Sequence, residues 1–156
     1  MAFEFYHARG FRNLAFLGNP GRPYSDLRLP GFRDAASSHG LQVALPPHLA
    51  DGLLPRDELT QWLKKLPPRT ALLAANDDFG GSALREIRAT GRAVPEDLVV
   101  LGVDNNELAC ELTHPALSSV DINTEEMGEQ AAGLLKRILR EPLPEEERRL
   151  QIHPRG

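Results

Sequence analysis

The 156-residue sequence predicts an α/β fold: a doubly wound parallel sheet covered by helices on both faces. Strand-like and helix-like segments alternate along the chain from end to end. The strand-like segments are almost continuous apolar runs, so both of their faces must be covered. Parallel strands need crossover connections, and the intervening helical segments supply them.

The expected strands are short, and most of them stop at turn signals or polar residues. Residues 14–17 precede Gly18-Asn19-Pro20-Gly21, which we interpret as a turn. This turn lacks both the Gly-Lys-Ser/Thr ending of a phosphate loop and the G-x-G-x-x-G spacing. Further strands are predicted over residues 41–45, 71–75, 98–103 and, at the end of the chain, 149–153.

Helices are expected between and after these strands, over residues 25–38, 57–66, from the triplet 76–78 to 90, and 124–141. Pro30 suits a first turn, so the regular part of the first helix should begin about there. Gly40 and Gly91 are expected to end their helices. Residues 48–56 are predicted to be a loop, and Trp62 a core residue.

The composition argues against several classes of function. With 22 acidic and 18 basic residues the net charge is −4, so no basic field attracts a phosphate backbone. The single cysteine, Cys110, allows neither an intrachain disulfide nor a cysteine-based zinc cluster, which favours a reducing cytoplasm. We find neither a signal-peptide pattern at the start nor a stretch near the ~18 apolar residues of a membrane span.

Motifs of catalysis, metal binding and cofactor binding are incomplete. Gly80-Gly81-Ser82 is not a nucleophile elbow, since position 84 is leucine. The five histidines form no H-x-x-x-H pair, and no later strand-end lysine completes a magnesium site at Asp77-Asp78. We therefore expect no catalytic residues, no metal and no cofactor.

Polar residues follow the predicted strands where ligands of open parallel sheets bind. They are Asn19, the triplet Asn76-Asp77-Asp78 and the triplet Asp104-Asn105-Asn106. Hydroxyl groups donate to aspartate oxygens and exchange hydrogen bonds with asparagine amides, so this set suits a polyhydroxyl ligand. Such residues also cap helices. Capping and binding carry equal weight for Asp77 and Asp78, whereas binding is favoured for Asn76 and Asp104.

An ordered set of segments carries a resemblance to a known family. Asn76-Asp77 after an apolar strand is followed by Val94-Pro95-Glu96-Asp97-Leu98, Gly102-Val103-Asp104-Asn105 and Pro115-Ala116-Leu117-Ser118-Ser119-Val120. With residues 10–16 and 28–32 upstream, they resemble the effector domain of lac/gal-repressor-type transcription regulators, which is similar to periplasmic sugar-binding proteins of type I. Residues 101–105 and 108–112 resemble most the xylose-operon activators, which carry an AraC-type DNA-binding domain. The resemblance covers about residues 7–140.

The resemblance implies a sugar-sensing regulator and not an enzyme. Arg28, Asn76 and Asp104 match the family positions that grip the sugar, and the implied inducer is a small neutral sugar, a pentose such as xylose. Phe79 is implied either as an apolar face beside the sugar or as a core residue. A sugar-binding protein of a transport system and an uncharacterised α/β enzyme remain as alternatives.

The resemblance also implies that residues 1–156 are one ligand-sensing lobe, the second of two. The first lobe and the DNA-binding domain are expected to be absent, so DNA would be bound only through that missing domain. In the family the helix at 124–141 packs in the first lobe. Its apolar stripe would then fold back, fray, or pair with a second copy, and we favour a homodimer. The stripe is Met127, Ala131, Leu134, Leu135 and Ile138.

Overall fold

The structure is a computed structural model that describes residues 1–47 and 54–155. These residues form two compact units, Met1–Ser119 and Val120–Gly156.

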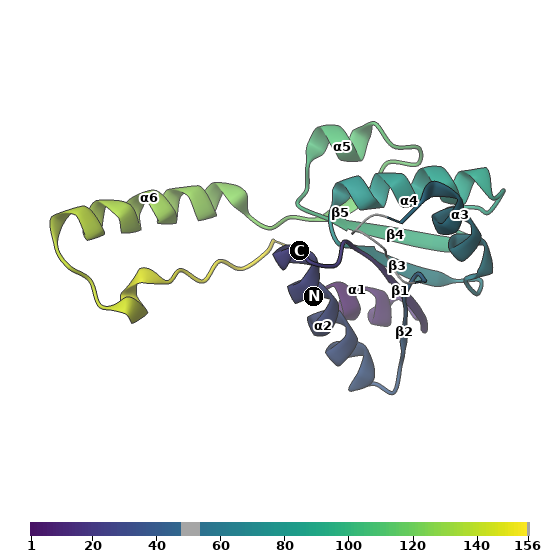
Figure 1. The fold of residues 1–156 in the computed structure, drawn as a ribbon, viewed down its shortest axis with the longest axis horizontal. Helices are drawn as coiled ribbons and strands as arrows, with labels where there is room; N and C mark the ends of the chain where they lie inside the picture. The colour runs from purple at the N-terminus through teal and green to yellow at the C-terminus, as the bar shows by residue number, and fades with distance from the viewer. Residues whose placement is uncertain (48–53, 156) are drawn as a thin grey trace. The chain divides into compact units, whose positions relative to one another are not determined.

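The sheet runs in the order β2-β1-β3-β4-β5 (Figure 1). The pairings of β1 with β2, β1 with β3, and β3 with β4 are all parallel, so the predicted doubly wound α/β sheet is confirmed. The chain first moves from β1 to one edge and then crosses back to β3. The carboxyl ends of β1 and β3 therefore flank the topological switch point, where open α/β sheets bind ligands. The strands are β1 (Asn13–Leu17), β2 (Val43–Ala44), β3 (Thr70–Ala74), β4 (Leu98–Val103) and β5 (Ser118–Val120).

Helices cover both faces of this sheet. One face carries α1 (Ala2–Ala8) and α2 (Pro23–Ser37), which contact each other (Figure 1). The other carries α3 (Arg56–Lys65), α4 (Asp77–Ala89) and α5 (Glu107–Glu111), with α4 packed against both of its neighbours.

The core lies between the sheet and its helices. Every residue of β3 is buried, as expected of a central strand covered on both faces. Trp62 packs into this core from α3, as predicted. On the opposite face, the buried Tyr6 hydroxyl donates to the Leu72 carbonyl at 2.7 Å and fastens α1 to the sheet. Burial raises the pKa of Tyr6 well above its ordinary value, so this hydroxyl stays a donor.

Several predicted boundaries were wrong. The first-turn preference of proline applies to Pro23, where α2 begins, and Pro30 lies inside the helix on its exposed side. The predicted strand at 41–45 is reduced to the two residues of β2 at the sheet edge. Within the loop predicted for 48–56, residues 48–53 lie outside the described residues, and Arg56 already belongs to α3.

The predicted strand at 149–153 was also wrong. A short 3-10 helix (Glu145–Arg148) precedes it, and only an isolated bridge between Asp121 and Arg155 forms near the end of the chain. The hydrophobic pattern did not predict α1, α5 or β5, which have seven, five and three residues. Elements of this length hold too few residues for a periodicity to show.

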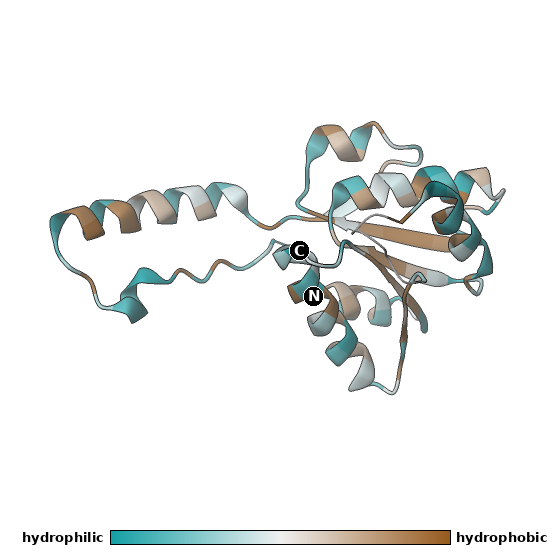
Figure 2. Cartoon of the chain, viewed as in Figure 1, coloured by the Kyte–Doolittle hydropathy of each residue, from teal (hydrophilic) through white to brown (hydrophobic). Residues whose placement is uncertain are grey.

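The unit Val120–Gly156 contains the amphipathic helix α6 (Thr124–Arg140), and none of its residues is buried. Hydrophobic residues recur along it (Figure 2), and four of them are well exposed: Met127, Leu135, Ile138 and Leu139. Within its own unit, α6 therefore leaves uncovered most of the apolar stripe predicted from the sequence. None of the helices in residues 1–47 and 54–155 is long and apolar enough to cross a membrane.

Candidate ligand-binding site

Arg28 joins α2 to the ends of two strands on the far side of the switch point. Its Nη1 donates to the carbonyl of Ala75, directly after β3, and its Nη2 donates to Asp104 Oδ1 at 3.2 Å, directly after β4. The ring of Tyr24, one turn earlier on α2, lies 5.6 Å from the guanidinium carbon. The side chains of Arg28 and Asp104 keep 26% and 40% of their surface exposed, so a ligand can reach both charges.

Asn76 serves as the N-cap of α4. Its side-chain oxygen accepts from the Phe79 N–H at 3.0 Å, which satisfies one of the unpaired donors of the first turn. From the sequence, capping was expected more at Asp77 and Asp78 than at Asn76, but the cap is Asn76. Because its oxygen is occupied, the half-buried Asn76 offers a ligand mainly its amide N–H donors.

Asp77 is a buried structural carboxylate with 4% of its surface exposed. Its Oδ2 accepts from the Asn106 N–H at 2.7 Å, and its Oδ1 accepts from the Ser119 hydroxyl at 2.5 Å. The same hydroxyl oxygen accepts from the Asn105 N–H at 3.0 Å. Asp77 and Ser119 therefore hold the turn that follows Asp104.

The turn after β4 is conformationally strained. Asp104 and Asn105 have φ angles of +113° and +53°, in the region that side-chain-bearing residues rarely adopt. Each such residue costs about 1–3 kcal/mol and persists only where the surroundings fix it. The hydrogen bonds from Asp77 and Ser119 fix it here, so the strained backbone aims Asp104 toward Arg28.

Gly102 makes room for this arrangement. A Cβ at this position would overlap Asp77 Oδ1 and lie 3.0 Å from Leu117 Cδ2. Cys110 also lies beside the buried carboxylate. Burial and the negative charge of Asp77 raise the pKa of its thiol, which therefore stays protonated at neutral pH.

The Asp104 carboxylate is partly desolvated, although its side chain keeps 40% of its surface exposed. Desolvation by burial raises its pKa above the ordinary value; the charge of Arg28 opposes this, while Asp77 and Asp78 add to it. A partly desolvated carboxylate with one ion-pair partner gains from hydroxyl groups that donate to it.

The site therefore offers a guanidinium, an amide donor and a carboxylate acceptor at adjacent strand ends. Of the strand-end residues, Asp104 bonds to Arg28, and Asn76 follows Ala75, whose carbonyl also bonds to Arg28. Asp77, in contrast, is buried. Asp78 is exposed, and the Asn19 backbone N–H donates to Ser25 Oγ at 2.9 Å. Within the described part of the chain, no three His, Cys, Asp or Glu residues are placed to hold a metal ion.

This fold and these strand-end groups agree with a family match over residues 3–156, to the periplasmic binding protein-like domain. The chain belongs to this family. The resemblance inferred from the sequence segments is thereby confirmed.

Relatives of this periplasmic binding protein-like chain are transcription regulators. The xylose operon regulatory proteins of Haemophilus influenzae and of Escherichia coli K12 are 33% and 34% identical over 150 and 155 residues, or 89% and 92% of this chain. The chain spans 38% of the length of each.

Solved structures that resemble this chain are also of transcription regulators. The xylose-binding transcription activator xylR superposes with a TM-score of 0.87 at 32% identity, covering 98% of this chain and 42% of that one. The regulator CelR in complex with cellobiose gives a TM-score of 0.70 at 32% identity, covering 90% of this chain and 44% of that one.

Gly102→Ala should destabilise the protein by about 1–3 kcal/mol, because the new methyl group forces apart Gly102 and the buried Asp77 carboxylate. Urea unfolding measures this change. Gly31→Ala is the matched control, since its Cβ meets nothing within 4 Å on α2, and it should stabilise by about 0.5–1 kcal/mol. Equal effects of the two substitutions would show that Gly102 is not sterically required.

Asp104→Asn should gain stability relative to the parent as the pH rises from about 4 to 7. The folded-state pKa of Asp104 is raised, so its stabilising contribution is complete below the ordinary carboxyl pKa and is lost as the pH passes the raised value. The asparagine has no charge to desolvate. Thermal unfolding across this pH range measures the difference, with Asp34→Asn on the exposed side of α2 as the control for net charge. If the stability of Asp104→Asn relative to the parent fell as the pH rises, the raised pKa of Asp104 would be contradicted.

Proposed function

We propose that residues 1–156 form the sugar-sensing lobe of a bacterial transcription regulator whose inducer is a pentose such as xylose. The observation that carries the proposal is the pair Arg28–Asp104, held across the switch point, with Asn76 next in the chain to the Ala75 carbonyl that Arg28 binds. The names of the relatives, xylose operon regulators among them, point to the same function.

A neutral polyhydroxyl ligand fits the charges of this site. The positive charge of Arg28 and the negative charge of Asp104 cancel, so an ionic ligand would find one of them repulsive. Asp104 accepts hydrogen bonds from sugar hydroxyls, whereas the Arg28 fork and the Asn76 amide donate to hydroxyl or ring oxygens. Each hydroxyl thus has both an acceptor and a donor to meet.

The lobe acts in this proposal by binding and not by catalysis. Residues 1–156 are one of two lobes that enclose the sugar, and DNA is bound by a different domain of the regulator in the cytoplasm. The net charge of −4 supports this division, because a surface with excess negative charge repels a phosphate backbone.

Arg28→Ala and Asp104→Ala should each weaken xylose binding about 10–100-fold, because each removes a charged hydrogen-bonding group worth about 1.5–3 kcal/mol. Isothermal titration of the complete gene product that contains these residues measures the affinity. Arg33→Ala, on the exposed side of the same helix, is the control and should leave it unchanged. Unchanged affinity in both site variants would contradict the proposal.

Residues 1–156 alone should not retard operator DNA in a gel at low salt. A retarded band would contradict the proposal that a different domain binds DNA.

We further propose that the chain forms a homodimer through α6. Water contact along its apolar stripe forfeits about 1.5–3 kcal/mol for each large side chain, and a second copy of the helix would cover it. Ala131 lies between the larger residues Met127 and Leu135 at four-residue intervals and would let two helices approach closely.

Leu135→Lys combined with Ile138→Lys should raise the dimer dissociation constant more than about 100-fold, because both side chains lie exposed on the stripe. Light scattering of the 156-residue chain at high micromolar concentration gives its mass. Glu129→Lys changes an exposed charge on the same helix and should preserve the dimer. A parent chain that is monomeric under these conditions would disprove the pairing.

A further inference from the structure

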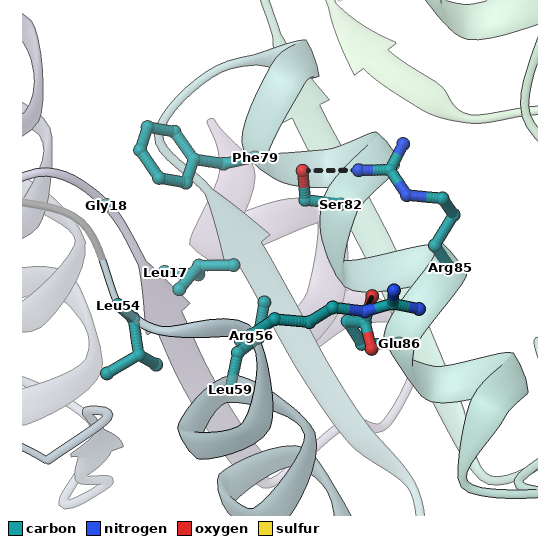
Figure 3. Close-up of a pocket in the computed structure, with 9 residues that line it drawn as sticks. All are labelled: Leu17, Gly18, Leu54, Arg56, Leu59, Phe79, Ser82, Arg85 and Glu86. Carbon is teal, nitrogen blue, oxygen red and sulfur yellow. Dashed lines mark hydrogen bonds and ion pairs between the residues drawn. The ribbon is translucent and has the colours of Figure 1, made fainter.

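A cavity of about 340 Å³ lies between α3 and α4 (Figure 3). It is separate from the proposed sugar site, since Arg28, Asn76 and Asp104 do not line it. Its size is at the lower end of the range typical of small-molecule sites. The lining residues are Leu17, Gly18, Leu54, Arg56, Leu59, Phe79, Ser82, Arg85 and Glu86.

The walls of this cavity differ in chemistry. Leu17 from β1, Leu59 from α3 and Phe79 from α4 give it an apolar side. In Figure 3 the guanidinium groups of Arg56 and Arg85 lie across the cavity from the Phe79 ring. A molecule that fills the cavity therefore meets apolar groups at one end and positive charge at the other.

The two arginines are not equivalent. Arg56 Nε donates to Glu86 Oε1 at 2.8 Å, and Thr60 donates to Glu86 Oε2 at 2.8 Å, so the buried Glu86 carboxylate is satisfied and balances Arg56. Arg85 donates only to the neutral hydroxyl of Ser82, at 3.0 Å, and has no carboxylate partner among the described residues. The cavity wall therefore carries one uncompensated positive charge with several N–H donors.

We propose that this cavity binds a small amphipathic monocarboxylate. Its carboxylate accepts from the Arg85 guanidinium and from the Ser82 hydroxyl, and its short alkyl or aryl body packs on Leu17, Leu59 and Phe79. A single unbalanced arginine matches one negative charge, and the apolar wall opposite gives no partner to the further charges of a phosphate. The site does not depend on sugar binding.

The test titrates hexanoate into the 15N-labelled 156-residue chain and follows its amide resonances. Hexanoate should shift the amides of residues 79–86 and saturate with a dissociation constant of about 0.1–1 mM, as expected of a ligand of this size. Hexanamide has the same alkyl body without the charge and should bind at least about 10-fold more weakly. Saturable shifts that hexanamide reproduces at the same concentration would overturn the proposal.

Variants on one helix locate the site. Arg85→Gln should weaken hexanoate binding at least about 10-fold, and Ser82→Leu should abolish it by filling the cavity. Arg88→Gln is the matched control: it is exposed one turn further along α4, does not line the cavity, and should bind like the parent. Binding that survives Arg85→Gln, or shifts that never saturate, would disprove the site.

Discussion

The buried carboxylate of Asp77 is the constraint on which the candidate sugar site depends. A buried charge is tolerated only where hydrogen bonds replace the water it has lost, and Asp77 obtains them from the Asn106 N–H and the Ser119 hydroxyl. These bonds tie the start of α4 to the turn after β4 and to β5. The strained turn at Asp104 and Asn105 and the absence of a side chain at residue 102 both follow from them.

Arg28 and Asp104 hold each other in place through their ion pair. A ligand that binds such a site does not have to order the two side chains, which lowers the entropy it must lose on binding. The cost is that Arg28 and Asp104 must bond to the ligand hydroxyls while they still bond to each other. The partly desolvated Asp104 carboxylate eases this, because burial raises its pKa in spite of the ion pair and further hydroxyl donors stabilise its charge.

The sequence predicted those parts of the fold whose pattern is long or uninterrupted. β4 was predicted to the residue, since six consecutive apolar residues end at a polar triplet. The site was harder to predict, because Asn76 and Asp77 are adjacent polar residues and only the folded backbone shows that one caps α4 while the other is buried. Arg28 was found through the family resemblance alone, since its helical pattern does not distinguish it from Arg33. The cavity at Arg85 was missed because its walls come from separate elements that carry no shared motif.

Contact between residues 77 and 102 has a consequence for how related sequences diverge. The aspartate at 77 penalises every side chain at 102, because even a methyl group overlaps its carboxylate. A lineage that replaces Asp77 with a smaller residue removes the severe overlap, and only the tighter-than-usual approach to Leu117 Cδ2, at 3.0 Å, then opposes alanine or serine at position 102. The reverse order of changes is disfavoured, since a larger residue at 102 would have to arise beside an intact carboxylate. Glycine at 102 is therefore expected to outlast, in any lineage, the aspartate that requires it.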